Sequence, residues 1–129
     1  HILQEESELQ EIVRLVGQDA LSAKDRLTME TAKMIREDFL QQNAFVDEDA
    51  YSSYKKQFRL LDIVLKYDEL CRSALQGDVN IEKLFVIEAR EAIGRAKMAD
   101  PNNFDPVYDK IEAEMKEQID NVVAEGGEQ

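Results

Sequence analysis

The run from Tyr54 to Gln76 most constrains what this chain can fold into, because apolar residues cover more than half the circumference of the helix that it predicts. A helix with so wide an apolar arc needs neighbours on several sides. We therefore expect it to lie at the centre of a helical bundle. Its apolar residues are Phe58, Leu60, Leu61, Ile63, Val64, Leu65, Tyr67, Leu70 and Cys71.

Two amphipathic segments precede this run. Acidic residues in the first turn of residues 5–16 favour a helix N-terminus, and Gly17 predicts its end. Ser22, followed three residues later by Asp25, forms a capping-box variant that predicts a second helix from near Ala23. We expect one buried face on each helix: Leu9, Ile12, Val13 and Val16 on the first, and Leu27, Met34, Ile35 and Phe39 on the second.

The second helix is expected to continue to Gln42 and to end at Asn43, since asparagine tolerates the left-handed conformation that ends many helices. An acidic loop follows, in which Ser52 or Ser53 is available to cap the central helix.

A fourth helix is predicted after Gly77, with Asp78 or Asn80 as its cap. It is expected to continue to Ala96 as one amphipathic helix, because its apolar residues share one face. They are Ile81, Leu84, Phe85, Ala89, Ala92, Ile93 and Ala96.

Pro101 ends that helix, and Asp105 with Pro106 predicts a cap and a first helical position. The fifth helix should extend to about Ala124, before Gly126 and Gly127. We expect its buried stripe to be Val107, Ile111, Met115, Ile119 and Val122. The opposite face is interpreted as solvated rather than as a docking surface, and consists of Asp109, Glu112, Lys116, Glu117 and Asp120.

No repeat, linker or strand-like alternation competes with these helices. The predicted fold is all-α, with residues 1–129 forming one helical bundle of about five helices. The net charge of −12 argues against a nucleic acid ligand and favours a basic protein partner. No apolar run reaches the roughly 18 residues of a membrane span, so direct membrane insertion is not expected.

The chain lacks the residue patterns of a self-contained enzyme. Its one histidine is His1, its one cysteine is Cys71, and it contains no HExxH, EF-hand or GxxxxGK[ST] pattern. We predict no catalytic residue, no metal ligand and no cofactor within this chain. Cys71 is interpreted as a small buried apolar residue, with a reactive thiol as the alternative.

Several runs resemble the end of the catalytic A subunit of archaeal-type and vacuolar-type rotary ATPases. The most specific is MIREDFLQQNAF, Met34 to Phe45. The resemblance covers most of residues 7–98 and leaves residues 100–129, the final helix and its tail, uncovered. The histidine that the family usually carries after QNAF is absent. The supporting runs are LQEIVRLVG (Leu9 to Gly17), DALSAKDRLTMETAKM, KQFRLLDIVLKYDE (Lys56 to Glu69) and IGRAK (Ile93 to Lys97).

The resemblance implies that this chain is the C-terminal helical domain of a longer subunit, whose separate nucleotide domain holds ATP and magnesium. A start at His1 rather than Met is consistent with a piece of something longer. By resemblance, Phe45 forms an aromatic wall at the adenine end of the nucleotide, and Gln42, Asn43 and Ala44 shape the rim of the pocket. The alternative is that Phe45 packs into the bundle as a core residue.

The resemblance also implies a mechanical role at the stalk-facing end of the catalytic hexamer. The partners would be the B subunit and the central-stalk subunits, on the cytoplasmic side of the membrane. The complex would couple ATP hydrolysis or synthesis to proton or sodium transport, whereas the isolated chain is expected to be inactive. A different interpretation is a stand-alone acidic adaptor that binds a partner helix or a basic protein surface.

Overall fold

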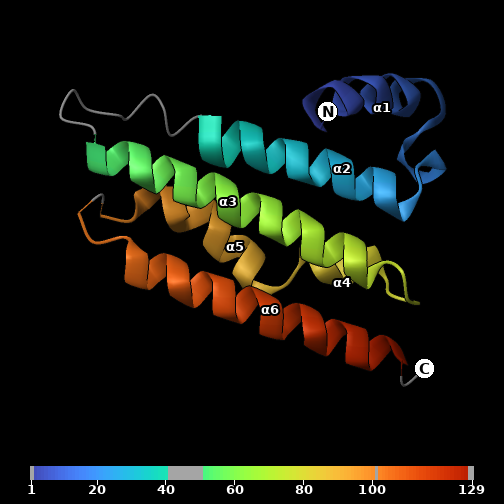
Figure 1. The fold of residues 1–129 in the computed structure, drawn as a ribbon. Helices are drawn as coiled ribbons and strands as arrows, with labels where there is room; N and C mark the ends of the chain where they lie inside the picture. Colours follow the sequence, from blue (N-terminus) through green and yellow to red (C-terminus); the bar gives the residue numbers. More distant parts are fainter. Residues whose placement is uncertain (1, 41–50, 101, 128–129) are drawn as a thin grey trace.

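The computed structural model describes residues 2–40, 51–100 and 102–127, and these residues form helices without any β-strand (Figure 1). The all-α prediction is confirmed. The α-helices are α1 (Ile2–Val16), α2 (Ala23–Met34), α3 (Tyr51–Ala74), α4 (Ile81–Phe85), α5 (Glu88–Arg95) and α6 (Asp105–Gly127). Shorter turns are the 3-10 helices η1 (Gln18–Ala20) and η4 (Ala96–Met98) and the π-helix η2 (Ile35–Leu40).

Helix α3 lies between α2 and α6 and contacts both, so its predicted central position is confirmed (Figure 1). The apolar arc is narrower than we expected. Phe58 is 68% exposed and Leu65 is 42% exposed. Both side chains lie on the side of α3 that no other described helix covers. The buried residues of α3 include Leu60, Ile63, Val64, Tyr67 and Cys71.

Helix α1 ends as predicted, because Gly17 adopts a φ of +94°, which a glycine accepts without strain. The prediction that one apolar face of this helix is buried holds only in part. Leu9 and Val13 are half-buried, but Ile12 and Val16 are exposed, and the buried residue that α1 contributes is Glu6. The physical reason is that α1 packs mainly against α2, and no other described helix covers the side that carries Ile12 and Val16.

Helix α2 begins as predicted, since the Ser22 side chain caps it by accepting a 3.1 Å hydrogen bond from the Asp25 N–H. Regular α-helix ends at Met34, and η2 continues the chain as a π-helix, which we did not predict. The expected end at Asn43 lies outside the described residues. Helix α3 already includes residues 51–53, so the prediction that Ser52 or Ser53 caps it was wrong.

The predicted fourth helix is two helices. Asn80 caps α4 as expected, by accepting a 3.0 Å hydrogen bond from Glu82, but the helix stops after Phe85 and α5 begins at Glu88. Between them Ile87 is extended, with φ −65° and ψ 149°. The apolar residues on either side of the break are still buried or half-buried, as predicted.

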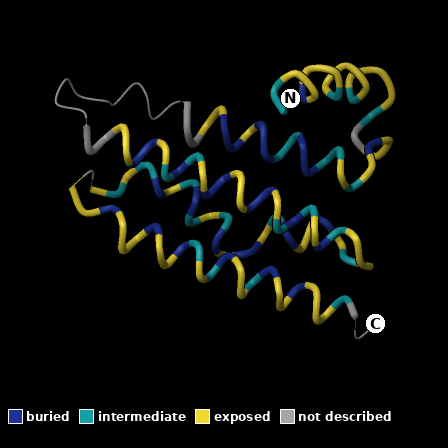
Figure 2. The backbone as a smooth tube through the Cα atoms, in the orientation of Figure 1, coloured by how far each residue is buried: buried dark blue, intermediate teal, exposed yellow. Residues whose placement is uncertain are grey.

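Helix α6 buries most of its predicted stripe, but Tyr108 is fully buried where we expected Val107, which is 44% exposed. The helix continues through Gly126 to Gly127 instead of ending near Ala124. A Cβ atom at Gly126 would lie 2.8 Å from the carbonyl oxygen of Asp78, so this glycine lets α6 approach the α3–α4 loop closely. Figure 2 shows the alternation of buried and exposed residues along α6.

Candidate functional site

The candidate nucleotide-pocket residues Gln42, Asn43, Ala44 and Phe45 lie outside the described residues. The structure does describe the helical elements that precede and follow them in the sequence. The end of η2 and the start of α3, which border residues 41–50 in the sequence, lie at the same end of the bundle as the start of α6 (Figure 1), and both elements contact η4. We call this region, formed by η2, the first turns of α3, η4 and the first turn of α6, the loop end.

The loop end begins with an irregular helix. In η2 the chain is wound as a π-helix directly after Met34, a form that occurs mostly in short pieces and frequently at functional sites. The side chain of Arg36 in this turn forms an ion pair with Glu6 of α1. The segment that leads into QNAF is therefore tied to α1 as well as to α2.

Two polar side chains are buried in the first turns of α3, Lys56 and Gln57, each 5% exposed. The Lys56 ammonium donates to the carbonyl of Lys97 in η4. Burial lowers the pKa of Lys56, and the negative charge of Asp100 partly opposes this shift. The amide nitrogen of Gln57 has no hydrogen-bond partner among the residues that the structure describes. Within that part of the chain the loop end keeps this buried donor unpaired, which is uncommon in folded proteins.

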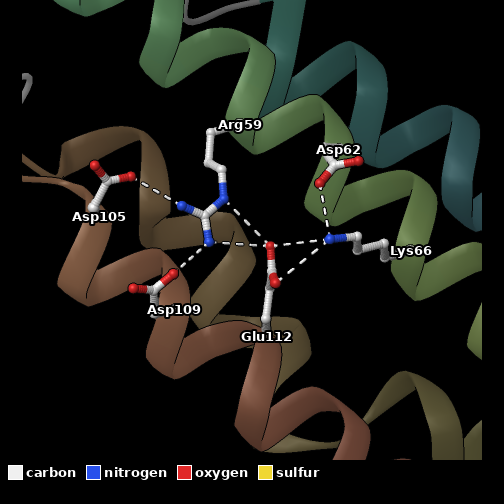
Figure 3. Close-up of polar contacts among 6 residues, drawn as sticks. All are labelled: Arg59, Asp62, Lys66, Asp105, Asp109 and Glu112. Carbon is white, nitrogen blue, oxygen red and sulfur yellow. Dashed lines mark hydrogen bonds and ion pairs between the residues drawn. The ribbon is translucent and has the colours of Figure 1, made fainter.

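Helices α3 and α6 are joined by ion pairs that the structure brings together from distant sequence (Figure 3). Arg59 lies 2.9 Å from Asp105, 2.7 Å from Asp109 and 3.2 Å from Glu112. The carboxylates of Asp105, Asp109 and Glu112 face one side chain, because the first two residues are four positions apart and the last two are three positions apart on one helix. We call these pairs the α3–α6 ion-pair network; Lys66 completes it, at 3.1 Å from Asp62 and 3.5 Å from Glu112.

The network adds to our interpretation of α6 as a solvated face. Asp109, Lys116, Glu117 and Asp120 are exposed as expected, but Glu112 is half-buried, and Asp109 and Glu112 both accept hydrogen bonds from Arg59. The pKa of Arg59 is raised, chiefly by the hydrogen bond that its guanidinium donates to Asp109. Sequence reasoning missed this role, because nothing near Arg59 in the chain indicates that α6 is its partner.

A buried polar cluster joins α2 to α3. The Thr31 hydroxyl donates to Asp68 at 2.6 Å, and Arg72 donates to Asp68 at 2.8 Å and to the Thr28 hydroxyl at 2.8 Å. We call this group the α2–α3 polar cluster. Gln57 lies three helical turns before Asp68 and so on the same, α2-facing side of α3. Helices α2 and α3 are therefore joined by hydrogen bonds as well as by apolar packing.

Cys71 is fully buried, and burial raises its pKa to about 12. Desolvation likewise raises the pKa of the neighbouring Tyr67, whose hydroxyl donates to the carbonyl of Leu84. A thiol that stays protonated at neutral pH is a poor nucleophile. The interpretation of Cys71 as a small buried residue is confirmed.

Metal ions and membranes are two further possible binding partners. In the described residues, no group of three or more His, Cys, Asp or Glu side chains is placed to hold a metal ion. No described helix is both long enough and apolar enough to cross a bilayer.

Comparison with known proteins assigns the family. A family model described as the C-terminal domain of V and A type ATP synthase matches residues 1–84. The chain is 50% identical over 123 residues to the V-type ATP synthase alpha chain of Acetivibrio thermocellus. This alignment covers 95% of the present chain and 21% of the relative.

Relatives from two Clostridium species carry the same name. The alpha chain of Clostridium novyi is 48% identical over 127 residues, and that of Clostridium botulinum strain Hall is 47% identical over 126 residues. Each alignment covers 98% of this chain and 21% of the relative, so the chain spans about a fifth of the length of these relatives. The alignments thus extend into the final helix, and the chain belongs to the family of C-terminal domains of V- and A-type ATP synthases.

Proposed function

We propose that this domain works within the alpha chain of a rotary ATP synthase, where it contributes the adenine end of the nucleotide pocket and transmits nucleotide-dependent movement. The observation that carries the proposal is the 50% identity, over 95% of this chain, to a protein named V-type ATP synthase alpha chain. In this proposal Phe45 forms the aromatic wall of the pocket, and Gln42, Asn43 and Ala44 form its rim.

The position of these residues in the chain supports the pocket role. They lie in a connection between η2 and α3, two elements that are anchored in the core by Ile35, Leu60 and Val64. The two elements that border the candidate pocket residues are therefore held in place by the core. Stacking of a base on an aromatic ring contributes about 1–3 kcal/mol, so the phosphates and magnesium must be held elsewhere in the subunit.

The packing supports the mechanical role. A displacement of residues 41–45 acts on α2 and α3 together, because the α2–α3 polar cluster joins them. Helix α6 follows α3, because the α3–α6 ion-pair network and the shared core join those two helices. Packed interiors deform little, so such a bundle moves as one body.

The proposal includes the remaining features of the parent complex. ATP is hydrolysed or synthesised with magnesium in the nucleotide domain, and turnover is coupled to proton or sodium transport. The domain faces the central stalk and neighbours the B subunit. The complex holds the domain peripherally, on the cytoplasmic side of the membrane.

The test is nucleotide binding to the full-length subunit with Phe45→Ala. We expect the affinity for ATP to fall about 10- to 100-fold, and the affinity for tripolyphosphate, which has no base, to stay unchanged. Phe58→Ala is the matched control, because Phe58 is an aromatic residue of α3 that is 68% exposed. An ATP affinity equal in Phe45→Ala and Phe58→Ala would overturn the pocket role.

A further inference from the structure

A cleft of about 260 Å³ lies where α1, α2 with η2, and α4 meet. It is smaller than the roughly 300–1,000 Å³ of sites that hold drug-sized ligands, so it suits a small ion or molecule. Cations outnumber carboxylates along its wall, although the whole chain has a net charge of −12. We call it the α1–α2–α4 cleft; its charged residues are Arg26, Lys33, Arg36, Glu6 and Glu30.

Both carboxylates of the cleft already have a guanidinium partner. Glu6, which is 7% exposed, forms an ion pair with Arg36. Glu30 accepts two hydrogen bonds from Arg90, from Nε at 3.0 Å and from Nη2 at 2.8 Å. Neither carboxylate is therefore left over to neutralise a further cation of the cleft.

Two cationic side chains on α2 remain to attract an anion. Lys33 is exposed and forms no ion pair with any residue that the structure describes. Arg26 has one ion pair, 3.3 Å long, with Glu82, which does not line the cleft and whose side chain is 66% exposed. Solvent weakens such a pair. Because Arg26 and Lys33 are seven residues apart, they lie on one side of α2, two turns from each other.

The guanidinium of Arg26 lies against the ring of Phe85, which also lines the cleft. Its central carbon is 5.9 Å from the ring centroid, a cation–π contact that holds the group in place. The Nε–H of Arg26 is buried and has no acceptor within the described residues. Since buried donors are nearly always paired, this donor favours a ligand that brings an acceptor oxygen.

We propose that the α1–α2–α4 cleft binds a small oxyanion of the phosphate type, with Lys33 and Arg26 as its main donors and Arg36 at its border. Ammonium and guanidinium groups form short, charge-assisted hydrogen bonds to phosphate oxygens. A nucleic acid carries the same groups, but the net charge of −12 opposes binding of an extended polyanion. The cleft does not include residues 42–45, so this inference goes beyond the proposed function and does not rest on it.

The test is a titration of the ¹⁵N-labelled 129-residue chain with inorganic phosphate, followed through the chemical shifts of its amides. We expect saturable shifts around Arg26 and Lys33. Half-saturation should lie at about 1–10 mM, the affinity that two or three charge-assisted hydrogen bonds supply. Shifts that do not saturate, or that sodium chloride of equal ionic strength reproduces, would overturn the inference.

Lys33→Gln is the variant that tests the site, because Lys33 is exposed and its replacement leaves the packing intact. We expect the half-saturating phosphate concentration to rise about fivefold, whereas Lys33→Arg should keep the wild-type value. Lys110→Gln is the matched control, since it makes the same change of charge at a side chain of α6 that is 75% exposed. Equal weakening by Lys33→Gln and Lys110→Gln would show attraction by overall charge alone and would overturn the inference.

Acetate distinguishes phosphate from a carboxylate, such as the side chain of another protein. It offers one negative charge and two acceptor oxygens, so we expect it to bind about fivefold more weakly than phosphate. Acetate binding as tight as that of phosphate would overturn the assignment of a phosphate-type ligand.

Discussion

The backbone N–H of Ala89 donates a 2.8 Å hydrogen bond to the side-chain oxygen of Gln118, which connects the first turn of α5 to α6. On the other side of the same break, the Tyr67 hydroxyl donates a 2.7 Å hydrogen bond to the carbonyl of Leu84. A break in a helix leaves backbone donors and acceptors without their usual partners. Side chains of α3 and α6 supply those partners, which lets the chain turn between α4 and α5 without an unsatisfied group at either position.

Gln118→Ala is expected to lower the free energy of unfolding by about 1–2 kcal/mol, because it leaves the N–H of the buried Ala89 unsatisfied. Gln118→Glu should retain most of the stability, since a carboxylate still accepts the bond and is favoured at a helix N-terminus. Urea unfolding measures both. Asn121→Ala, an exposed amide in the same helix, is the control. Equal losses for Gln118→Ala and Asn121→Ala would contradict the role of this bond.

Arg59→Ala is expected to lower the free energy of unfolding by about 1 kcal/mol at low salt. Three carboxylates lose their shared partner, but Asp105 and Asp109 are about 70% exposed, so solvent weakens each pair. Lys110→Ala is the control, because Lys110 is 75% exposed and forms one long pair with Glu114. Denaturation at low and at 1 M salt tests the electrostatic origin, since screening should reduce the Arg59 effect. A loss independent of salt would indicate lost packing instead.

The stability of the fold is expected to fall at alkaline pH in a way that depends on Cys71. Burial raises the pKa of this thiol from 9.0 to about 12. Between these values the unfolded thiol has lost its proton and the folded thiol retains it, so the unfolded chain binds fewer protons and stability decreases as pH rises. Lys56 acts in the opposite direction below pH 10.5, because its pKa is lowered on folding.

A comparison of variants isolates the thiol. The wild-type chain should lose about 1 kcal/mol per pH unit more than Cys71→Ala between pH 9.5 and 11, although Cys71→Ala is less stable at pH 7. Urea unfolding at a series of pH values gives both curves. Parallel curves would show that the thiol ionises alike in the folded and unfolded chains.

Gly126→Ala is expected to destabilise the fold by about 1 kcal/mol. The added methyl group meets the Asp78 carbonyl at 2.8 Å, and the strain exceeds the gain in helix propensity. Gly77→Ala is the matched control, because its Cβ would lie 3.7 Å from the nearest atom, an ordinary contact. Thermal unfolding of the two variants tests the difference. A stabilised Gly126→Ala would show that the end of α6 moves aside readily.

Local sequence determined much of the helical framework. The ends marked by Gly17, Ser22 and Asn80 follow from the conformational freedom of glycine and from hydrogen bonds within three residues. The central position of α3 follows from its own apolar periodicity. These features were predictable because the causes lie within one helix or next to it in the chain. The four candidate pocket residues, 42–45, came from the family resemblance, and their role stays a prediction.

Tertiary structure alone decided the features that depend on partners distant in the chain. The α4–α5 break needs Tyr67 and Gln118, and the role of Asp109 needs Arg59 fifty residues earlier. The exposure of Leu15 follows from which side of α1 meets α2. Helical periodicity specifies that a face is apolar, but not which neighbour covers it, because burial is a property of two surfaces and the sequence of one helix describes only one of them.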